Sequence, residues 1–330
     1  MKAAVITRPG GPEVLEIQDR PQPQPTGEDV LVRVHASALN RADLLQREGK
    51  YPAPPGSPPD IPGLEFAGEI QALGPRASMW TKGQRVFGLV GGGAQAEYVV
   101  VHERAVAEIP ARLGWAEAAA VPEAFITAHD ALWVQAGLRP GERVLIHAVG
   151  SGVGLAAVQV VRAINAECFG TSRNADKIRR ATEYGLNAGA VISDPVVELP
   201  DHTRQWTGGT GFNVVLDLAG GAYVRASIDA LGPKGRLMLV GTVAGAKSDF
   251  NVGMLMGKRL TIRGTVMRAR PLEEKIEAIR RFAAEVLPLF ASGVLRPTID
   301  REFPLDRIAD AHTHLQSNST FGKVVLTLAG

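Results

Sequence analysis

A glycine-rich turn is the stretch of this sequence best suited to chemistry. In VLIHAVGSGVGLAAVQV, residues 144–160, an apolar run passes through three glycines and a serine at 150–154 into a second apolar run. Residues with little or no side chain let a pyrophosphate approach the backbone N–H groups at the start of a helix. The spacing departs from G-x-G-x-x-G, because Val149 and Ser151 occupy its first two glycine positions. A predicted strand before the turn and a predicted helix after it nonetheless favour a dinucleotide site.

Two other interpretations of the turn compete with this one. A glycine-rich turn can bind nothing and serve only to reverse the chain. Ser151 could instead be a hydrolase nucleophile, but the G-x-S-x-G pattern requires glycine where Val149 and Val153 stand. The hydrolase interpretation therefore fails on pattern, and further strand and helix units downstream support a bound dinucleotide.

Basic residues follow the second predicted strand of this region. At this point an acid would bind a ribose 2′-hydroxyl, whereas small polar and basic residues would bind a 2′-phosphate. The stretch GTSRNADKIRR places Ser172 at the acid's position, with Arg173 and Lys177 close by. Arg and Lys neutralise a phosphate that a carboxylate would repel, so the sequence predicts NADP(H). The alternative is that Arg173, Lys177, Arg179 and Arg180 form only a solvated helix face.

Strands and helices alternate around the glycine turn. Strands are predicted at 143–148, 167–171, 190–192, 214–218, 236–240 and 260–264, and helices at 152–165, 175–184 and 223–231. This alternation predicts an α/β fold with a doubly wound parallel sheet. Short Val-rich and Ala-rich runs before residue 110 predict a separate β-rich part.

The residue patterns before and after this α/β region differ from the alternation within it. Ala-rich helical spacing covers 115–137, with Pro122 as a break or a helix start. Helices at 272–293 and 305–316 are followed by a last strand at 322–328. A strand placed after the parallel sheet is expected to fold back onto the first, β-rich part.

Composition excludes several classes of protein. The chain has 330 residues, 45% of them hydrophobic, and a formal net charge of +2 without long basic runs. Neither nucleic acid nor a membrane is therefore an expected partner, and neither a signal peptide nor an apolar membrane span is recognised. The single cysteine, Cys168, fits a reducing cytoplasm and is interpreted as a core residue.

Five motifs together carry a family resemblance over essentially the whole chain. They are NRADLLQREGKYP, IPGLEFAGEI, AAAVPEAFITA, HAVGSGVG and FGKVVLTL. The sequence resembles the zinc-free, zeta-crystallin-like quinone oxidoreductases of the medium-chain dehydrogenase/reductase superfamily. Within them it is most similar to the NADPH:quinone oxidoreductase subgroup that shares SALNRADLLQR and HxxxSGVG.

This resemblance implies a fold and an activity. A GroES-like β-barrel catalytic domain would comprise residues 1–121 and 267–330, and a Rossmann domain that binds NADPH would comprise 122–266. NADPH would lie in the cleft between them and pass hydride to a quinone. The protein would contribute positioning, exclusion of water and hydrogen-bond donors.

No metal site is expected. Zinc-dependent relatives place Cys before an R-x-D run and His in a G-H-E triplet, whereas this chain has Asn40 and Leu64 there. A catalytic zinc requires three protein ligands, of which two would be missing. His312 and His314 are two residues apart and are predicted to be a surface pair on different helix faces.

The resemblance also implies functional residues. Asn40, Asp43 and Tyr51 match the substrate side and are the predicted catalytic residues. The matched cofactor residues are Thr127, Gly150, Ser151, Gly152, Val153, Ser172, Arg173, Lys177, Val240, Gly241, Thr242, Val266, Met267, Phe321, Gly322 and Lys323. Structural alternatives stay open: Tyr51 could pack on proline rings, Asn40 could form a turn, and Asp43 could pair with Arg41 or Arg47.

Several questions of function stay open at this point. Many relatives carry a tyrosine near the 2′-phosphate where this chain has Asp194, and a carboxylate there disfavours NADP(H). The acceptor could be an α,β-unsaturated carbonyl instead of a quinone. A further alternative is an NADPH-binding sensor or structural protein with little turnover. A homodimer is expected to form along the edge of the Rossmann sheet, where the stretch 259–266 or its neighbour could pair across a two-fold axis.

Overall fold

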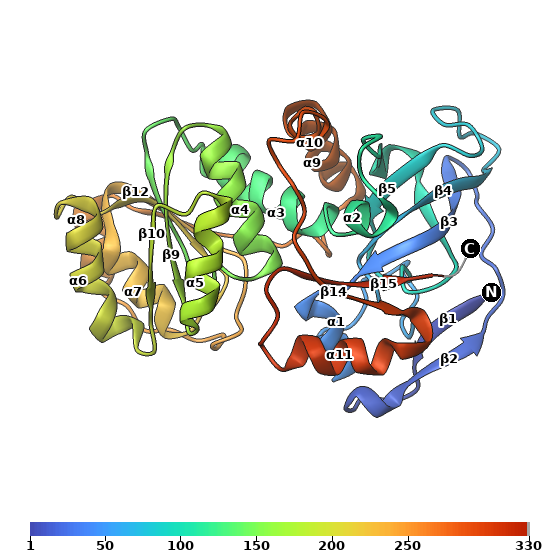
Figure 1. The fold of residues 1–330 in the computed structure, drawn as a ribbon, viewed down its shortest axis with the longest axis horizontal. Coiled ribbons are helices and arrows are strands. Elements are labelled where there is room, and N and C mark those ends of the chain that lie inside the picture. The colour runs from blue at the N-terminus through green and yellow to red at the C-terminus, as the bar shows by residue number, and fades with distance from the viewer. Residues whose placement is uncertain (329–330) are drawn as a thin grey trace. The chain divides into compact units, whose positions relative to one another are not determined.

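The computed structural model describes residues 1–328, which form two compact units (Figure 1). Unit 1 comprises residues 1–126 and the described part of the chain from Met267 onward. Unit 2 comprises residues 127–266. The short segment from Pro122 to Ile126 therefore packs with unit 1.

Unit 1 is built mainly on a seven-stranded sheet. Its strands are β3 (Asp29–Ala38), β4 (Glu65–Leu73), β5 (Arg85–Leu89), β6 (Tyr98–His102), β7 (Val106–Glu108), β14 (Ile299–Pro304) and β15 (Lys323–Thr327). They run in the order β14-β15-β3-β4-β5-β7, and β6 pairs with β3. A separate hairpin contains β1 (Lys2–Ile6) and β2 (Leu15–Asp19). Because β15 pairs antiparallel with β3, the predicted return of the C-terminal strand is confirmed.

Helices complete unit 1. They are η1 (Pro12–Val14), α1 (Arg41–Arg47), η2 (Glu103–Ala105), α2 (Trp115–Ala119), η3 (Pro122–Ile126), α9 (Leu272–Glu285), α10 (Leu287–Ala291), η6 (Leu305–Arg307) and α11 (Ile308–Gln316). Phe87 from the sheet packs near Phe282 of α9, and Phe125 of η3 meets Phe290 of α10 edge to face. The first contact joins α9 to the sheet, and the second attaches η3 to α10.

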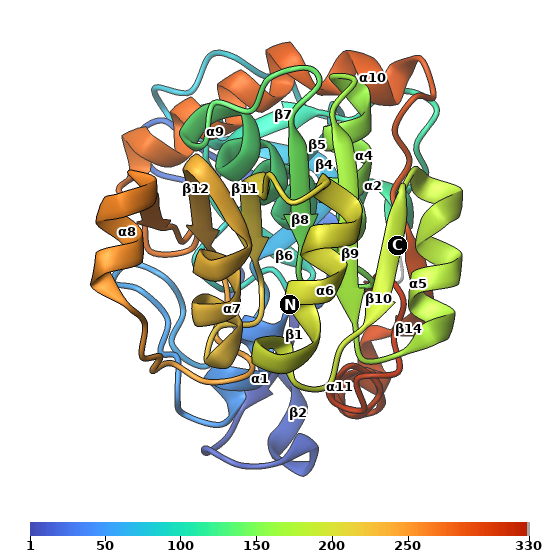
Figure 2. The same ribbon diagram turned by 90° about the vertical axis from the view of Figure 1, so that its left-hand side faces the viewer.

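Unit 2 is a parallel sheet covered by helices. Its strands are β8 (Arg143–Ile146), β9 (Glu167–Ser172), β10 (Ala188–Val191), β11 (Phe212–Asp217), β12 (Leu231–Leu239) and β13 (Thr261–Gly264). Their order is β10-β9-β8-β11-β12-β13, with parallel pairing throughout, and Figure 2 shows β10, β9, β8, β11 and β12 in this order. This is the strand order of a Rossmann sheet, with its switch point between β8 and β11. The predicted fold class is confirmed.

The helices of unit 2 depart in places from the sequence prediction. They are α3 (Thr127–His129), η4 (Asp130–Gln135), α4 (Gly152–Ala163), α5 (Ala175–Ala181), η5 (Thr182–Tyr184), α6 (Pro195–Thr207), α7 (Ala222–Ala230) and α8 (Val252–Lys258). Helix α6 was not predicted, because Pro200 lies inside it and its composition is polar. A proline at a helix start is favourable, and Pro195 begins α6.

Two long predicted helices are interrupted in the structure. The predicted helix at 272–293 divides into α9 and α10 around Val286, because Pro288 stands near the start of the second helix. The break predicted at Pro122 is confirmed, because α2 ends at Ala119 and η3 begins at Pro122; α3 and η4 follow, and η3 and η4 have π-helical turns. Turns of this kind occur often at functional sites.

Candidate active site

The glycine turn of unit 2 joins β8 to α4 with very little space for side chains. Ser151 caps α4, since its Oγ accepts a hydrogen bond of 3.1 Å from the Gly154 N–H. A Cβ atom on Gly154 would lie 2.6 Å from the Val149 carbonyl oxygen and 2.7 Å from that of Ala148. Only glycine therefore allows α4 to begin so close to the strand. The first N–H groups of such a helix form an anion-binding site.

The loops after β8, β11 and β12 belong to the carboxyl edge of the sheet. Asp217 ends β11, and its Oδ1 accepts the N–H groups of Ala219 at 2.7 Å and Gly220 at 2.9 Å. A Cβ on Gly241, in the loop after β12, would lie 2.5 Å from the Leu218 carbonyl oxygen. The predicted cofactor residues Val240, Gly241 and Thr242 thus pack against the loop after β11. Ligands of Rossmann sheets bind at this edge, next to the switch point.

The basic turn after β9 lies beside the glycine turn. An added Cβ on Gly150 would lie 2.8 Å from Cδ of Lys177, so the Lys177 stem packs on this glycine. Ser172 is nearly buried and accepts the Asn174 N–H at 3.2 Å, whereas Arg173 is exposed. The structure therefore brings together the glycine turn, which is predicted to bind the pyrophosphate, and the basic turn after β9, which is predicted to bind the 2′-phosphate.

The two acidic residues near this turn form hydrogen bonds or ion pairs with other groups of unit 2. Asp194 caps α6, where its Oδ1 accepts the Val196 N–H at 3.0 Å and the Val197 N–H at 3.4 Å. Asp176 pairs with Arg179 and Arg180 on the surface of α5. Helix N-termini stabilise a carboxylate, which gives Asp194 a structural role.

One further feature of unit 2 fits a nicotinamide dinucleotide. The Thr127 hydroxyl is buried and has no hydrogen-bond partner within residues 1–328. A buried hydroxyl without a partner is costly unless a ligand supplies one. The carboxamide of a nicotinamide has both a donor and an acceptor. Together with the N–H groups at the glycine turn, the Thr127 hydroxyl makes unit 2 suited to bind this cofactor.

Unit 1 contains a buried polar network around Glu65. Lys323 Nζ lies 2.6 Å from Glu65 Oε1, and these side chains are 6% and 0% exposed. Asn40 Nδ2 donates to Glu65 Oε1 at 2.9 Å, and Asn40 Oδ1 accepts from Lys323 at 2.6 Å. Lys323 also donates to the Leu39 carbonyl oxygen at 2.8 Å. Asn40 is therefore a positioning residue that joins the ion pair to the start of α1.

Asp43 also acts within unit 1 rather than at its surface. Its carboxylate accepts the Asn40 N–H at 2.7 Å and the Gly63 N–H at 3.0 Å, and the side chain is fully buried. The alternative of an ion pair with Arg41 or Arg47 is wrong for the described residues, because Asp43 binds backbone groups instead. Burial raises the pKa of Asp43 to about 6, while the two backbone hydrogen bonds oppose the rise. Asp43 thus fixes the loop before β4.

Tyr51 lies beside an arginine that sequence reasoning missed. Arg268 donates to the Gly91 carbonyl oxygen at 2.7 Å, to the Tyr51 carbonyl oxygen at 3.2 Å and to Gln46 Oε1 at 2.5 Å. Its guanidinium carbon is also 5.0 Å from the centre of the Tyr51 ring. Burial raises the pKa of the Tyr51 phenol and lowers that of the Arg268 guanidinium. Arg268 therefore holds the proline-rich loop and orients Tyr51.

Two carboxyl groups complete this region and were not among the predicted site residues. Glu65 lies in the GLE triplet, and Glu123 follows Pro122 in the apolar stretch AAAVPEAFITA. The Glu123 backbone N–H donates to Glu65 Oε2 at 2.7 Å. Burial and the charge of Glu65 raise the pKa of Glu123 to about 7. A charged residue inside an apolar stretch was the available sequence signal.

The remaining predicted residues lie at the ends of both units. Gly322 has a φ of 97°, and a Cβ there would lie 2.4 Å from the Thr298 carbonyl oxygen. The Phe321 ring is buried, and its N–H donates to Asp300 Oδ1 at 2.8 Å. Both residues therefore fix the start of β15. At the boundary of the units, Val266 is exposed and Met267 is buried.

The predicted surface pair of histidines is wrong. His312 is fully buried, and its Nδ1 lies 3.4 Å from Arg47 Nη1. Burial lowers the pKa of His312 to about 3, with a further contribution from the charge of Arg47. His314 is half-buried and lies 2.6 Å from Asp300 Oδ2. The two-residue spacing predicts different helix faces for the two histidines. It does not reveal that the tertiary fold buries His312 fully and His314 in part.

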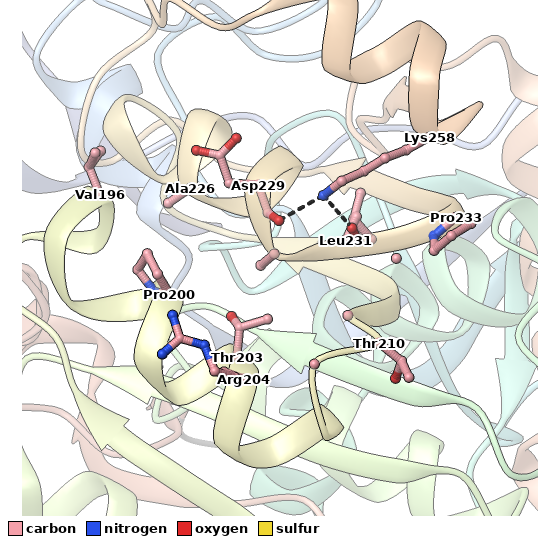
Figure 3. A pocket seen from close by; sticks show the side chains of 14 residues that line it. Val196, Pro200, Thr203, Arg204, Thr210, Ala226, Asp229, Leu231, Pro233 and Lys258 are labelled. Atoms are coloured by element: carbon pink, nitrogen blue, oxygen red, sulfur yellow. Dashed lines mark hydrogen bonds between the residues drawn. The ribbon is translucent and has the colours of Figure 1, made fainter.

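A pocket of 340 Å³ lies elsewhere in unit 2, among α6, α7 and α8 (Figure 3). Lys258 donates there to the carbonyl oxygens of Asp229 at 2.8 Å and Leu231 at 2.7 Å (Figure 3). The ammonium thus satisfies carbonyl groups at the end of α7. Because Leu231 begins β12, this pocket lies at the amino edge of the sheet, opposite the edge where cofactors bind.

No group of three or more His, Cys, Asp or Glu side chains within residues 1–328 is arranged to hold a metal ion. No helix in that part of the chain is long and apolar enough to span a membrane.

A glycine turn at the switch point of a parallel sheet, joined to a second, β-rich domain, is the plan of medium-chain dehydrogenases/reductases. Residues 26–111 match the family model of the alcohol dehydrogenase GroES-like domain, and residues 186–326 match that of zinc-binding dehydrogenases. The quinone oxidoreductase of Lama guanicoe is 33% identical over 99% of this chain and 98% of its own length. That of Pseudomonas aeruginosa is 34% identical over 96% of both chains.

A solved structure agrees with these matches. Escherichia coli quinone oxidoreductase complexed with NADPH has a TM-score of 0.87 and 28% identity, over 99% of this chain and 100% of that one. The chain belongs to the quinone oxidoreductase family of the medium-chain dehydrogenase/reductase superfamily. It is an oxidoreductase of a class that uses a nicotinamide cofactor.

Proposed function

We propose that this enzyme transfers hydride from NADPH to quinones without a zinc ion. The observation that carries the proposal is the contact between the glycine turn and the basic turn, where the Lys177 stem packs on Gly150. A pyrophosphate and a 2′-phosphate of one dinucleotide require neighbouring sites of this kind. The hydrogen bonds from the Val196 and Val197 N–H groups partly offset the negative charge of Asp194, which supports the proposal.

In this proposal, residues of unit 2 bind the cofactor, and Tyr51 of unit 1 contacts the acceptor. The N–H groups at 150–153 bind the pyrophosphate, and the Thr127 hydroxyl binds the carboxamide. Bound NADPH supplies the hydride. The Tyr51 phenol donates a hydrogen bond to the quinone oxygen, where negative charge develops. Where zinc relatives have a cysteine ligand, Asn40 binds the Lys323 ammonium at 2.6 Å, so a cation is already present in this part of unit 1.

The cofactor preference is tested with Arg173→Ala and Lys177→Ala. Each variant should lower kcat/KM for NADPH about 10-fold to 100-fold, because a charged hydrogen bond to the 2′-phosphate is lost. The value for NADH should change little, since NADH lacks this phosphate. Steady-state kinetics and titration of tryptophan fluorescence with each cofactor provide the measurement. Arg179→Ala is the matched control, because Arg179 pairs with Asp176 on the same helix; a wild-type preference for NADH would contradict the proposal.

The acceptor is tested by turnover on a panel. NADPH oxidation should depend on ortho-quinones or para-quinones, and enones compared at the same concentrations should react more slowly. Faster turnover of enones would instead favour a reductase of α,β-unsaturated carbonyls. Tight NADPH binding without turnover of any acceptor would favour the sensor or structural protein.

We also propose that two copies pair through β13, which is the edge strand of its sheet. The Thr265 N–H donates to the Leu239 carbonyl oxygen on β12, so alternation along the strand directs the Gly264 N–H away from β12. An exposed strand edge is a template for pairing with a second chain. Gly264→Pro should therefore produce monomers in analytical ultracentrifugation, whereas Gly264→Ala, which meets open space, should remain dimeric. If Gly264→Pro remained dimeric, β13 would not be the dimer interface.

A further inference from the structure

Glu123 is a carboxyl group that the proposed hydride transfer does not use. It lies in η3, and its backbone N–H is fixed by Glu65 Oε2 at 2.7 Å. Its side chain is partly exposed, and its carboxyl oxygens have no hydrogen-bond partner within residues 1–328. Glu65, by contrast, is fully buried and accepts from Asn40, Lys323 and the Glu123 backbone. Of these two neighbouring carboxyl groups, only Glu123 is available to a ligand.

Charged groups from every neighbouring element surround Glu123. Those that interact with it electrostatically are Glu65 on β4, Lys323 on β15, Asp43 on α1, Arg268 before α9, Lys275 on α9 and the phenol of Tyr51. The charged residue of β5, Arg85, donates to the Leu113 carbonyl oxygen. Glu123 therefore shares its surroundings with Tyr51, the residue proposed to contact the quinone.

These surroundings make Glu123 suited to proton transfer near neutral pH. Burial comes first among the causes that raise its pKa to about 7, and the negative charge of Glu65 adds to it. Lys323 and Arg268 oppose the rise. A general acid works best when its pKa lies near the working pH. The hydrogen bond from the Glu123 N–H to Glu65 Oε2 places this residue at the polar network that also contains Asn40, and its carboxyl group is open to a ligand.

We propose that Glu123 donates the proton that completes reduction of the acceptor next to Tyr51. This inference rests on the proposed function. The hydride brings two electrons from NADPH to the quinone, which leaves NADP⁺ and an anionic hydroquinone oxygen. The O–H bond of the Glu123 carboxyl group then breaks, and a new O–H bond forms on that oxygen. Glu123 becomes a carboxylate, and a proton from water restores the acid.

The protonation of Glu123 is tested first without cofactor or substrate. Infrared difference spectra of the full-length protein are recorded across a pH titration, following the C=O stretching band of protonated carboxyl groups. A band that disappears near pH 7 in the wild type should be missing in Glu123→Gln. Glu108→Gln is the matched control, since Glu108 is an exposed glutamate of the same unit. An unchanged band in Glu123→Gln would overturn the assignment.

Kinetics test the role itself. Because the protonated form is the donor, kcat of the wild type should fall as pH rises through about 7. Glu123→Gln should lose about a hundredfold in kcat and this pH dependence, while the affinity for NADPH in fluorescence titration stays the same. Glu123→Asp, which keeps a carboxyl group, should recover part of the rate. Glu123→Gln with wild-type kcat and pH profile would overturn the proposal.

The two proposals can fail separately. If the wild type reduces no quinone at any pH, the proposed function fails, and the infrared titration still reports on Glu123. If the wild type reduces quinones and Glu123→Gln does so equally well, only the role of Glu123 fails.

Discussion

Lys323→Met should destabilise the protein by about 3–5 kcal/mol, the cost typical of removing one partner from a buried ion pair. Glu65 is fully buried and lies 2.6 Å from Lys323 Nζ, so the substitution leaves its carboxylate without a counter-charge. The Leu39 carbonyl oxygen and Asn40 Oδ1 also lose their donor. Urea denaturation of wild type and variant measures the difference in the free energy of unfolding.

A second substitution and a control make this test specific. Glu65→Gln combined with Lys323→Met should recover part of the lost stability, because the buried charge is removed while an amide oxygen can still accept the Glu123 N–H. Lys2→Met removes an ion pair of similar length, 2.7 Å, in which both side chains are exposed. It should cause a far smaller loss. Equal losses for Lys2→Met and Lys323→Met would contradict a special role for the buried pair.

Gly154→Ala should weaken NADPH binding at least about tenfold, equivalent to about 1.4 kcal/mol. The added methyl group would lie 2.6 Å from the Val149 carbonyl oxygen and 2.7 Å from that of Ala148. These are backbone atoms, so α4 must move away from β8 and carry its first N–H groups out of place. Overpacking of this kind also costs about 1–3 kcal/mol of stability. Fluorescence titration with NADPH and urea denaturation measure the two effects.

Gly257→Ala is the matched control for Gly154→Ala. Gly257 also lies in a helix, α8, but an added Cβ there meets no atom within 4 Å. Alanine is the better helix former, so this variant should gain about 0.5–1 kcal/mol and bind NADPH as the wild type does. Unchanged NADPH binding by Gly154→Ala would show that the glycine turn tolerates a side chain.

Local patterns were enough to predict much of unit 2. The alternation of apolar runs and glycine turns indicated the parallel sheet, because each strand and each turn depends mainly on its own residues. Helix α6 was missed for a local reason as well, since Pro200 stands inside it. Its start at Asp194 and Pro195 follows ordinary capping chemistry, and its apolar face becomes evident only when Leu199 packs in the core of unit 2.

The site of unit 1 was predicted only in part. Asn40, Asp43 and Tyr51 came from a family resemblance, which did not reveal that Asn40 and Asp43 bind other groups of the protein. Arg268 was missed because its partners, among them Gly91, are distant in sequence. His312 was misplaced for a similar reason, since Arg47 on another helix covers it.

By itself the sequence determined the class of fold, the glycine turn at 150–154 and the basic turn near Arg173, because each depends on residues close together in the chain. Only the tertiary structure decided which ionisable groups are buried together. Glu65, Glu123 and Lys323 come from three separate segments, and their burial and mutual charge exist only after folding. A pKa depends on the dielectric surroundings and charges within a few ångströms, and no local sequence pattern encodes these.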